Sequence, residues 1–121
     1  MHAKTLWVMV LCTNFAFCAS AQQKQQRARE NDPKYQYNAG LVYLNQSYVD
    51  TKNIDEAIRF FVKSLALDTR YYLAWNGIGL AQSLKGNLAE AARSYEKCLE
   101  IEPTFTEAHN NLGTIYQEMN R

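Results

Sequence analysis

The chain has 121 residues, of which 47% are hydrophobic and 12% aromatic, enough for one small domain with its own core. Thirteen basic and twelve acidic side chains give a formal net charge of +1. A chain this close to neutral lacks a large basic face unless its charges segregate in space, so we expect no nucleic-acid partner.

Residues 1–21 have the pattern of a secretory signal peptide. Lys4 precedes an uncharged, mostly apolar run over residues 6–17, and residues 19–21 (Ala-Ser-Ala) are the small residues that signal peptidase prefers. We predict cleavage after Ala21 and a secreted or periplasmic mature protein. An uncleaved membrane anchor facing outside the cytoplasm stays open, because about 16 apolar or small residues fall just short of the roughly 20 that span a bilayer. A lipoprotein anchored through Cys18 is the third option.

Residues 22–31 are polar without apolar periodicity, which predicts a linker or a frayed lead-in. Asp32 followed by Pro33 then marks a helix start, with Asp as the cap and Pro in the first turn. Loss of the signal would leave Cys98 as the one thiol of the mature chain. We expect it to be a buried small hydrophobe and not part of a disulfide.

Residues 72–103 are predicted to form a helical hairpin. Apolar residues recur at helical spacing on both sides of a break at residues 85–87. Gly86 is expected to end the first helix, and Asn87 to cap the second, with Glu90 completing a capping box. Pro103 cannot donate the next helical hydrogen bond and is expected to end the second helix.

The hairpin repeats with a period of 34 residues, which pairs Ala91 with Ala57, Tyr95 with Phe61 and Gly79 with Gly113. A fixed period of this size predicts an all-α fold, an α-solenoid of stacked antiparallel helical hairpins with about two and a half units. We expect this domain to span residues 32–121, with units at about 33–71, 72–105 and a truncated 106–121.

The first unit departs from the period, because Gly40 precedes Gly79 by 39 positions and so five extra residues must lie between Gly40 and Asn53. Placed within residues 47–52, they predict an overlong first helix or a protruding turn at residues 48–51. We favour a tolerated surface insertion over a lip that contacts a partner.

The last predicted helix begins with a Thr104–Glu107 capping box and carries an apolar stripe that includes Leu112, Tyr116 and Met119. No second helix follows it in this sequence. Three explanations stay open: the helix caps the array, the chain is a fragment of a longer array, or another molecule, including a second copy, covers the stripe.

The residues Trp75, Ile78, Gly79, Ala91, Tyr95 and Pro103 match the pattern W-x2-L-G-x2-Y, A-x3-F and P, with Gln82 where Tyr is usual. From Lys34 to Arg121 the chain therefore resembles the tetratricopeptide repeat family. The resemblance implies that the first helix of each hairpin lines a concave, peptide-binding groove. Carried over position by position, the groove residues are Lys34, Tyr37, Leu41, Leu44, Asn45, Leu73, Asn76, Leu80, Ser83, Glu107, Asn110, Thr114 and Gln117.

These residues form a surface of amide and apolar groups with few charges, which suits a peptide with apolar anchors. Family members that clamp the carboxylate terminus of chaperones use Lys, Asn and Arg in the groove. The corresponding residues here are Tyr37, Leu41, Gly77, Glu107 and Asn111. We therefore do not expect a carboxylate clamp.

No catalytic, metal or cofactor site is predicted. His109 is the single histidine after the signal, it occupies the position of a structural Trp, and no ligand set accompanies it. The sequence thus predicts a non-enzymatic, extracytoplasmic scaffold or adaptor that binds a protein segment, resembling in organisation the proteins that assist assembly of envelope complexes. The alternative is a fragment of a larger multi-repeat protein whose activity lies beyond Arg121.

Overall fold

The computed structural model of the chain describes residues 2–48 and 50–121, and all regular secondary structure in those ranges is helical. The helices are α1 (His2–Glu30), α2 (Pro33–Asn45), α3 (Lys52–Leu67), α4 (Tyr72–Leu84), α5 (Leu88–Ile101) and α6 (Thr106–Met119). They fall into two compact units, which divide after Asn31. The predicted all-α fold is confirmed.

The first unit consists of α1, a helix of 29 residues. Residues 22–30, for which a linker or a frayed lead-in is predicted, are helical and continue α1, since Gln, Lys, Arg, Ala and Glu are all strong helix formers. Gln26 Nε2 adds a hydrogen bond of 3.3 Å to Glu30 Oε1, one turn further on. Among the described residues, no helix is both long enough and apolar enough to cross a membrane.

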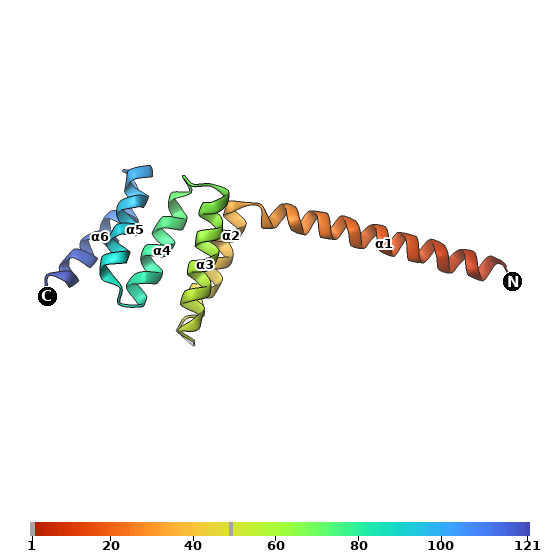
Figure 1. The fold of residues 1–121 in the computed structure, drawn as a ribbon, viewed down its shortest axis with the longest axis horizontal. Coiled ribbons are helices and arrows are strands. Elements are labelled where there is room, and N and C mark those ends of the chain that lie inside the picture. The colour runs from red at the N-terminus through yellow and green to blue at the C-terminus, as the bar shows by residue number, and fades with distance from the viewer. Residues whose placement is uncertain (1, 49) are drawn as a thin grey trace. The chain divides into compact units, whose positions relative to one another are not determined.

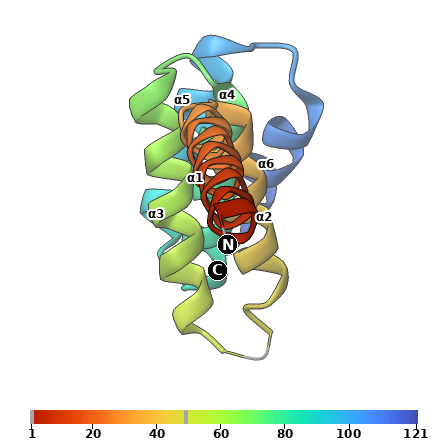
Figure 2. The same ribbon diagram turned by 90° about the vertical axis from the view of Figure 1, so that its right-hand side faces the viewer.

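The second unit is a stack of helical hairpins. Helices α2 and α3 form the first hairpin and α4 and α5 the second, while α6 packs on α5 (Figure 1). The first helices also contact one another, α2 with α4 and α4 with α6. Figure 2 shows α2 and α3 side by side in the first hairpin. The predicted solenoid of antiparallel hairpins is therefore confirmed.

In each complete hairpin, an aromatic ring from the second helix packs against a glycine of the first helix. A Cβ atom on Gly40 would lie 2.5 Å from Phe61 Cε1, and one on Gly79 would lie 2.7 Å from Tyr95 Cε1. Phe61 and Tyr95 are 0% and 1% exposed. Phe61 belongs to a core shared by α2, α3 and α4, and Tyr95 to one shared by α5 and α6. The absence of side chains on the glycines therefore lets the helices of a hairpin approach closely.

The turn between α4 and α5 has the predicted break at Gly86 but not the predicted cap. Gly86 has a φ of 80°, and its N–H donates to Ser83 O while the Asn87 N–H donates to Gln82 O, both at 2.9 Å. These two bonds close the end of α4 in a Schellman arrangement. Asn87 makes no side-chain capping bond to α5. Its Nδ2 donates instead to Gln82 Oε1, which contradicts the predicted capping box.

Two other predicted caps have opposite outcomes. Asp32 caps α2 as expected, since its Oδ1 accepts a 2.9 Å hydrogen bond from the Lys34 N–H. The Thr104–Glu107 capping box is wrong, because α6 begins at Thr106 and the Thr104 hydroxyl donates to Glu102 Oε1 at 2.6 Å. The Glu107 carboxylate is occupied elsewhere, as described below.

The extra residues of the first unit form a longer connection, not an overlong helix. Helices α2 and α4 both have 13 residues, whereas the first hairpin connection spans residues 46–51 and the second only 85–87. The remaining extra residues extend the first turn of α3. Residue 49 lies outside the described residues, but beside it Tyr48 is 88% exposed. The predicted protruding turn thus fits the described part of this connection.

Candidate functional site

The candidate site is the surface formed by α2, α4 and α6, which we call the first-helix face. It differs in charge from the rest of the domain. Helix α4 has no charged residue, α2 has Lys34, and α6 has Glu107 and Glu118. The second helices of the hairpins, α3 and α5, instead have five charged residues each. An uncharged helix in the middle of a surface favours contact with an apolar or amide-bearing ligand.

The structure places every predicted groove residue on α2, α4 or α6, but not all are accessible. Those with exposed side chains are Lys34, Asn45, Leu80, Glu107, Asn110, Thr114 and Gln117, and those partly buried are Tyr37, Leu41, Leu73 and Ser83. Leu44 and Asn76 are buried. The placement on three neighbouring helices follows the prediction, whereas the binding role of these residues stays a prediction.

Leu44 is not part of an accessible surface. It is 5% exposed and belongs to a core that α2 and α3 share with α4, together with Ile54 and Ile78. Leu41 also packs against that core. The repeat pattern predicts which helix a residue lies on, but the exposed fraction of its side chain depends on the residues that pack against it. Leu44 therefore contributes to the core, whereas Leu41 keeps a partly exposed side chain.

Tyr37 lies at the junction of the core and the first-helix face. The centre of its ring is 5.7 Å from the rings of both Phe61 and Tyr71. Burial raises the pKa of its hydroxyl, and the negative charge of Glu107 raises it further. The phenol is therefore neutral at physiological pH, where it can donate or accept a hydrogen bond.

A polar contact joins α4 to α6 and was not expected from the sequence. Asn76 Nδ2 donates to Glu107 Oε1 at 2.9 Å, and Asn76 is only 4% exposed. Its Oδ1 is buried and has no hydrogen-bond partner among the described residues. The sequence places both residues in the groove, but it predicts a capping role for Glu107 and gives no sign of its bond to Asn76.

The charge of Glu107 also acts on two buried groups of α5. Burial, with Glu107 as the next cause, raises the pKa of Tyr95 to about 12 and that of Cys98 to about 11. Cys98 is 0% exposed, so its thiol is protonated and shielded at neutral pH, and it is a poor nucleophile. The sequence prediction of a buried free cysteine at this position is confirmed.

The remaining candidate for chemistry, His109, is engaged in local structure. Its Nε2 lies 2.7 Å from the Pro103 carbonyl oxygen. Within residues 2–48 and 50–121 there is no cluster of three or more His, Cys, Asp or Glu that could hold a metal ion.

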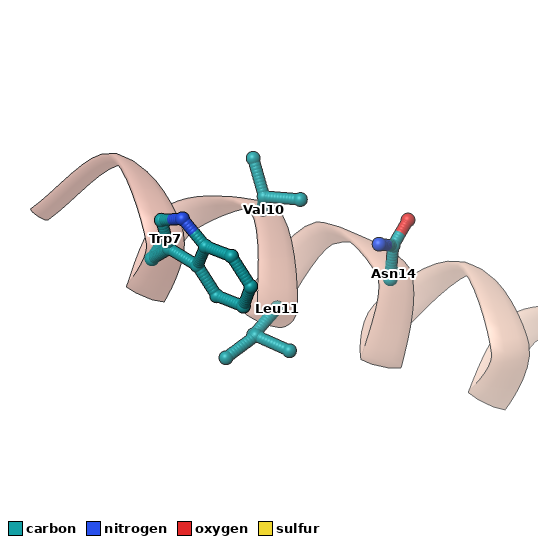
Figure 3. Close-up of a pocket in the computed structure, with 4 residues that line it drawn as sticks. All are labelled: Trp7, Val10, Leu11 and Asn14. Carbon is teal, nitrogen blue, oxygen red and sulfur yellow. The ribbon is translucent and has the colours of Figure 1, made fainter. Parts of the chain in front are cut away.

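Helix α1 carries a different kind of surface. Trp7, Val10, Leu11 and Asn14 line a pocket on this helix (Figure 3). Trp7 is 73% exposed, and the rings of Phe15 and Phe17 are similarly open. This concentration of exposed apolar side chains falls within the apolar run that the sequence predicts to be the core of a signal peptide.

Comparison with known families gives matches in the second unit of the structure. Two family models, both described as tetratricopeptide repeat, match residues 72–105 and residues 94–121. The first covers α4 and α5, and the second begins within α5 and includes all of α6. The matched residues thus include the second hairpin and α6.

The relatives found among curated proteins are much longer than this chain. Protein bimA of Emericella nidulans is 28% identical over 78 residues, which cover 64% of this chain and 9% of that protein. The peroxisomal targeting signal receptor of Saccharomyces cerevisiae is 27% identical over 82 residues, covering 68% and 13%. The probable UDP-N-acetylglucosamine–peptide N-acetylglucosaminyltransferase SPINDLY of Hordeum vulgare is 31% identical over 96 residues, covering 73% and 10%. The chain therefore spans only a small part of these proteins.

Solved structures are similar over most of the chain. The first TPR of Spaghetti (RPAP3), bound to the HSP90 peptide SRMEEVD, superposes with a TM-score of 0.67 at 28% identity, covering 75% of this chain and 68% of that one. A crystal structure of MamA gives a TM-score of 0.66 at 25% identity, covering 75% and 50%. The second TPR domain of human RPAP3, in complex with the HSP70 peptide SGPTIEEVD, gives 0.62 at 26% identity, covering 70% and 67%.

Proposed function

Since the chain belongs to the tetratricopeptide repeat family, we propose that it is a non-enzymatic scaffold or adaptor that binds a segment of another protein on its first-helix face. Two of the similar structures carry bound peptides, which supports a peptide or protein ligand for this fold. The observation that supports the location most directly is Leu80. It is an apolar residue, 36% exposed, on the uncharged central helix α4.

An apolar residue exposed between two neighbouring helices is suited to anchor a ligand side chain. Leu80 lies on α4, which contacts both α2 and α6, so a ligand over Leu80 reaches all three helices. Partly exposed Ser83 and exposed Asn110 and Thr114 add hydrogen-bonding groups on α4 and α6. An extended or helical segment with an apolar anchor and free backbone amides complements this surface.

The test is to select peptides from a phage-displayed random library on the full chain and measure their affinities by isothermal titration calorimetry. We expect Leu80→Glu to weaken the selected peptides by about tenfold or more, because it puts a charge in the apolar contact. Val62→Glu is the matched control, because Val62 is 52% exposed on α3, outside the first-helix face. No selected peptide, or equal affinity for Leu80→Glu and the native chain, would overturn the proposal.

We further propose that the protein acts outside the cytoplasm, where it assists assembly of an envelope complex. The support for export is the apolar run of residues 6–17, whose described side chains on α1 are largely exposed, followed by the small residues 19–21. Mass spectrometry of the intact exported protein should show Gln22 as its first residue. Full-length protein in the membrane fraction would contradict cleavage after Ala21.

A further inference from the structure

Acidic residues in the second unit differ in their ion pairs. Asp55 pairs with Lys85 at 2.6 Å, Glu90 with Arg93 at 3.2 Å, and Glu100 with Lys97 at 2.9 Å. Glu56 likewise pairs with Arg59. These acids lie on α3 and α5. Glu96 on α5 and both acids of α6, Glu107 and Glu118, have no ion-pair partner among the described residues. Glu107 lies on the first-helix face, and its side chain is exposed. It is therefore an exposed negative charge without a positive counterpart.

The start of a helix favours an acidic residue through the helix dipole, and Glu107 is in the first turn of α6. The dipole alone does not account for its contact with α4. Asn76 is only 4% exposed, and its Nδ2 donates a hydrogen bond of 2.9 Å to Glu107 Oε1. This hydrogen bond fixes the carboxylate at the junction of α4 and α6, beside the apolar centre of the face.

The accessible polar group at this junction is the Glu107 carboxylate, which is an acceptor. Asn76 Nδ2 donates one hydrogen bond to it, whereas Asn76 Oδ1, which has no partner among the described residues, is buried and out of reach of a ligand. The Glu107 carboxylate has lone pairs beyond the one that Asn76 uses, since an ionised carboxylate is an acceptor only. Glu107 is also close enough to the Tyr37 hydroxyl to affect its titration. A ligand group that complements the exposed Glu107 carboxylate supplies N–H donors and a positive charge.

We propose that the first-helix face selects a peptide segment with a lysine or arginine side chain, which binds Glu107 at the junction of α4 and α6. The proposal rests on the peptide-binding function proposed above and adds the charge of the ligand. It also separates this chain from the two similar structures, whose bound peptides SRMEEVD and SGPTIEEVD are acidic. An acidic segment would bring like charges together at Glu107, which is unfavourable in a partly desolvated contact.

The experiment uses peptides selected from the random library on the full chain. We expect them to share a lysine or arginine at a fixed position relative to an apolar residue. Replacing that cationic residue by glutamine should weaken binding by about tenfold or more, because a charge-assisted hydrogen bond is lost. Glu107→Gln should have a similar effect on the cationic peptide. Raising the salt concentration should weaken the cationic peptide more than its glutamine variant.

The test variant Glu107→Gln is compared with a control variant, Glu100→Gln. Glu107→Gln keeps an oxygen that can accept from Asn76, so the contact between α4 and α6 is retained while the charge is removed. Glu100→Gln makes the same change in net charge on α5, where the side chain is 62% exposed, and it should leave affinity unchanged. In a second selection, Glu107→Lys should enrich peptides with Asp or Glu at the position of the cation.

The outcomes separate the two proposals. The charge preference would be overturned if the selected peptides depend on Leu80 but share no cationic residue. It would also be overturned if they bind Glu107→Gln as tightly as the native chain. Either result would leave the proposed binding face in place. Peptides that bind Leu80→Glu unchanged would overturn the binding face itself. Tighter binding of SRMEEVD than of the selected cationic peptides would also contradict the inference.

Discussion

At the scale of the residue, three glycines at matching positions of the repeat have different surroundings. The rings of Phe61 and Tyr95 occupy the space in which side chains on Gly40 and Gly79 would lie. A Cβ atom on Gly113 would meet nothing within 4 Å. The sequence pattern gives all three the same role. The difference arises because no ring among the described residues packs against Gly113.

This difference predicts opposite effects of the same substitution. Gly79→Ala should lower the free energy of unfolding by about 1 kcal/mol or more, because the methyl group collides with the buried Tyr95 ring and the cost exceeds the gain in helix propensity. Gly113→Ala should raise it by roughly 0.5–1 kcal/mol, because only the propensity gain remains. Urea unfolding followed by circular dichroism measures both. Midpoints that shift in the same direction would contradict this account of the contact.

At the scale of the element, helix ends show where local sequence rules hold. Asp32 accepts a hydrogen bond from the first turn of α2, whereas Asn87 makes no such bond to α5. Asp32→Ala should therefore cost about 1 kcal/mol of stability, and Asn87→Ala should stay within about 0.5 kcal/mol of the native chain. Thermal unfolding of the two variants tests this. Equal losses of stability would show that Asn87 caps α5 in solution.

Helices α2 to α6 and their order could be predicted from the sequence because apolar spacing, Gly86 and the period of the repeat all act locally or between neighbouring hairpins. The caps at Asn87 and Thr104 were predicted wrongly because each side chain had a competing partner, Gln82 and Glu102 respectively. A short polar side chain near a turn has several partners in reach. The sequence pattern alone does not rank them.

At the scale of the whole molecule, the candidate site was predicted in position but not in detail. The repeat register placed its residues on α2, α4 and α6, since every first helix presents the same positions. Register does not give burial, so Leu44 and Asn76 were assigned to the surface although they are 5% and 4% exposed. It also does not give contacts between units, such as that of Asn76 with Glu107, 31 residues apart.

The position of each helix in the array predicts how readily it opens. Helix α4 contacts α2, α3, α5 and α6, whereas α6 contacts α4 and α5. In a repeat array, each unit is stabilised mainly by its neighbours, so a helix with fewer neighbours opens at lower cost. On α6 the side that carries Gly113 is open, and Tyr116 and Met119 are 43% and 49% exposed.

We therefore expect backbone amides of α6 to exchange with deuterium fastest among α2 to α6, and those of α4 slowest, because exchange requires opening of the helix. Hydrogen–deuterium exchange with mass spectrometry measures this order. A series of protein concentrations is the control, since a second copy that covered the stripe of Leu112, Tyr116 and Met119 would slow exchange as concentration rises. Protection of α6 equal to that of α4 at low concentration would contradict the order, because opening of α6 would then not depend on its number of neighbours.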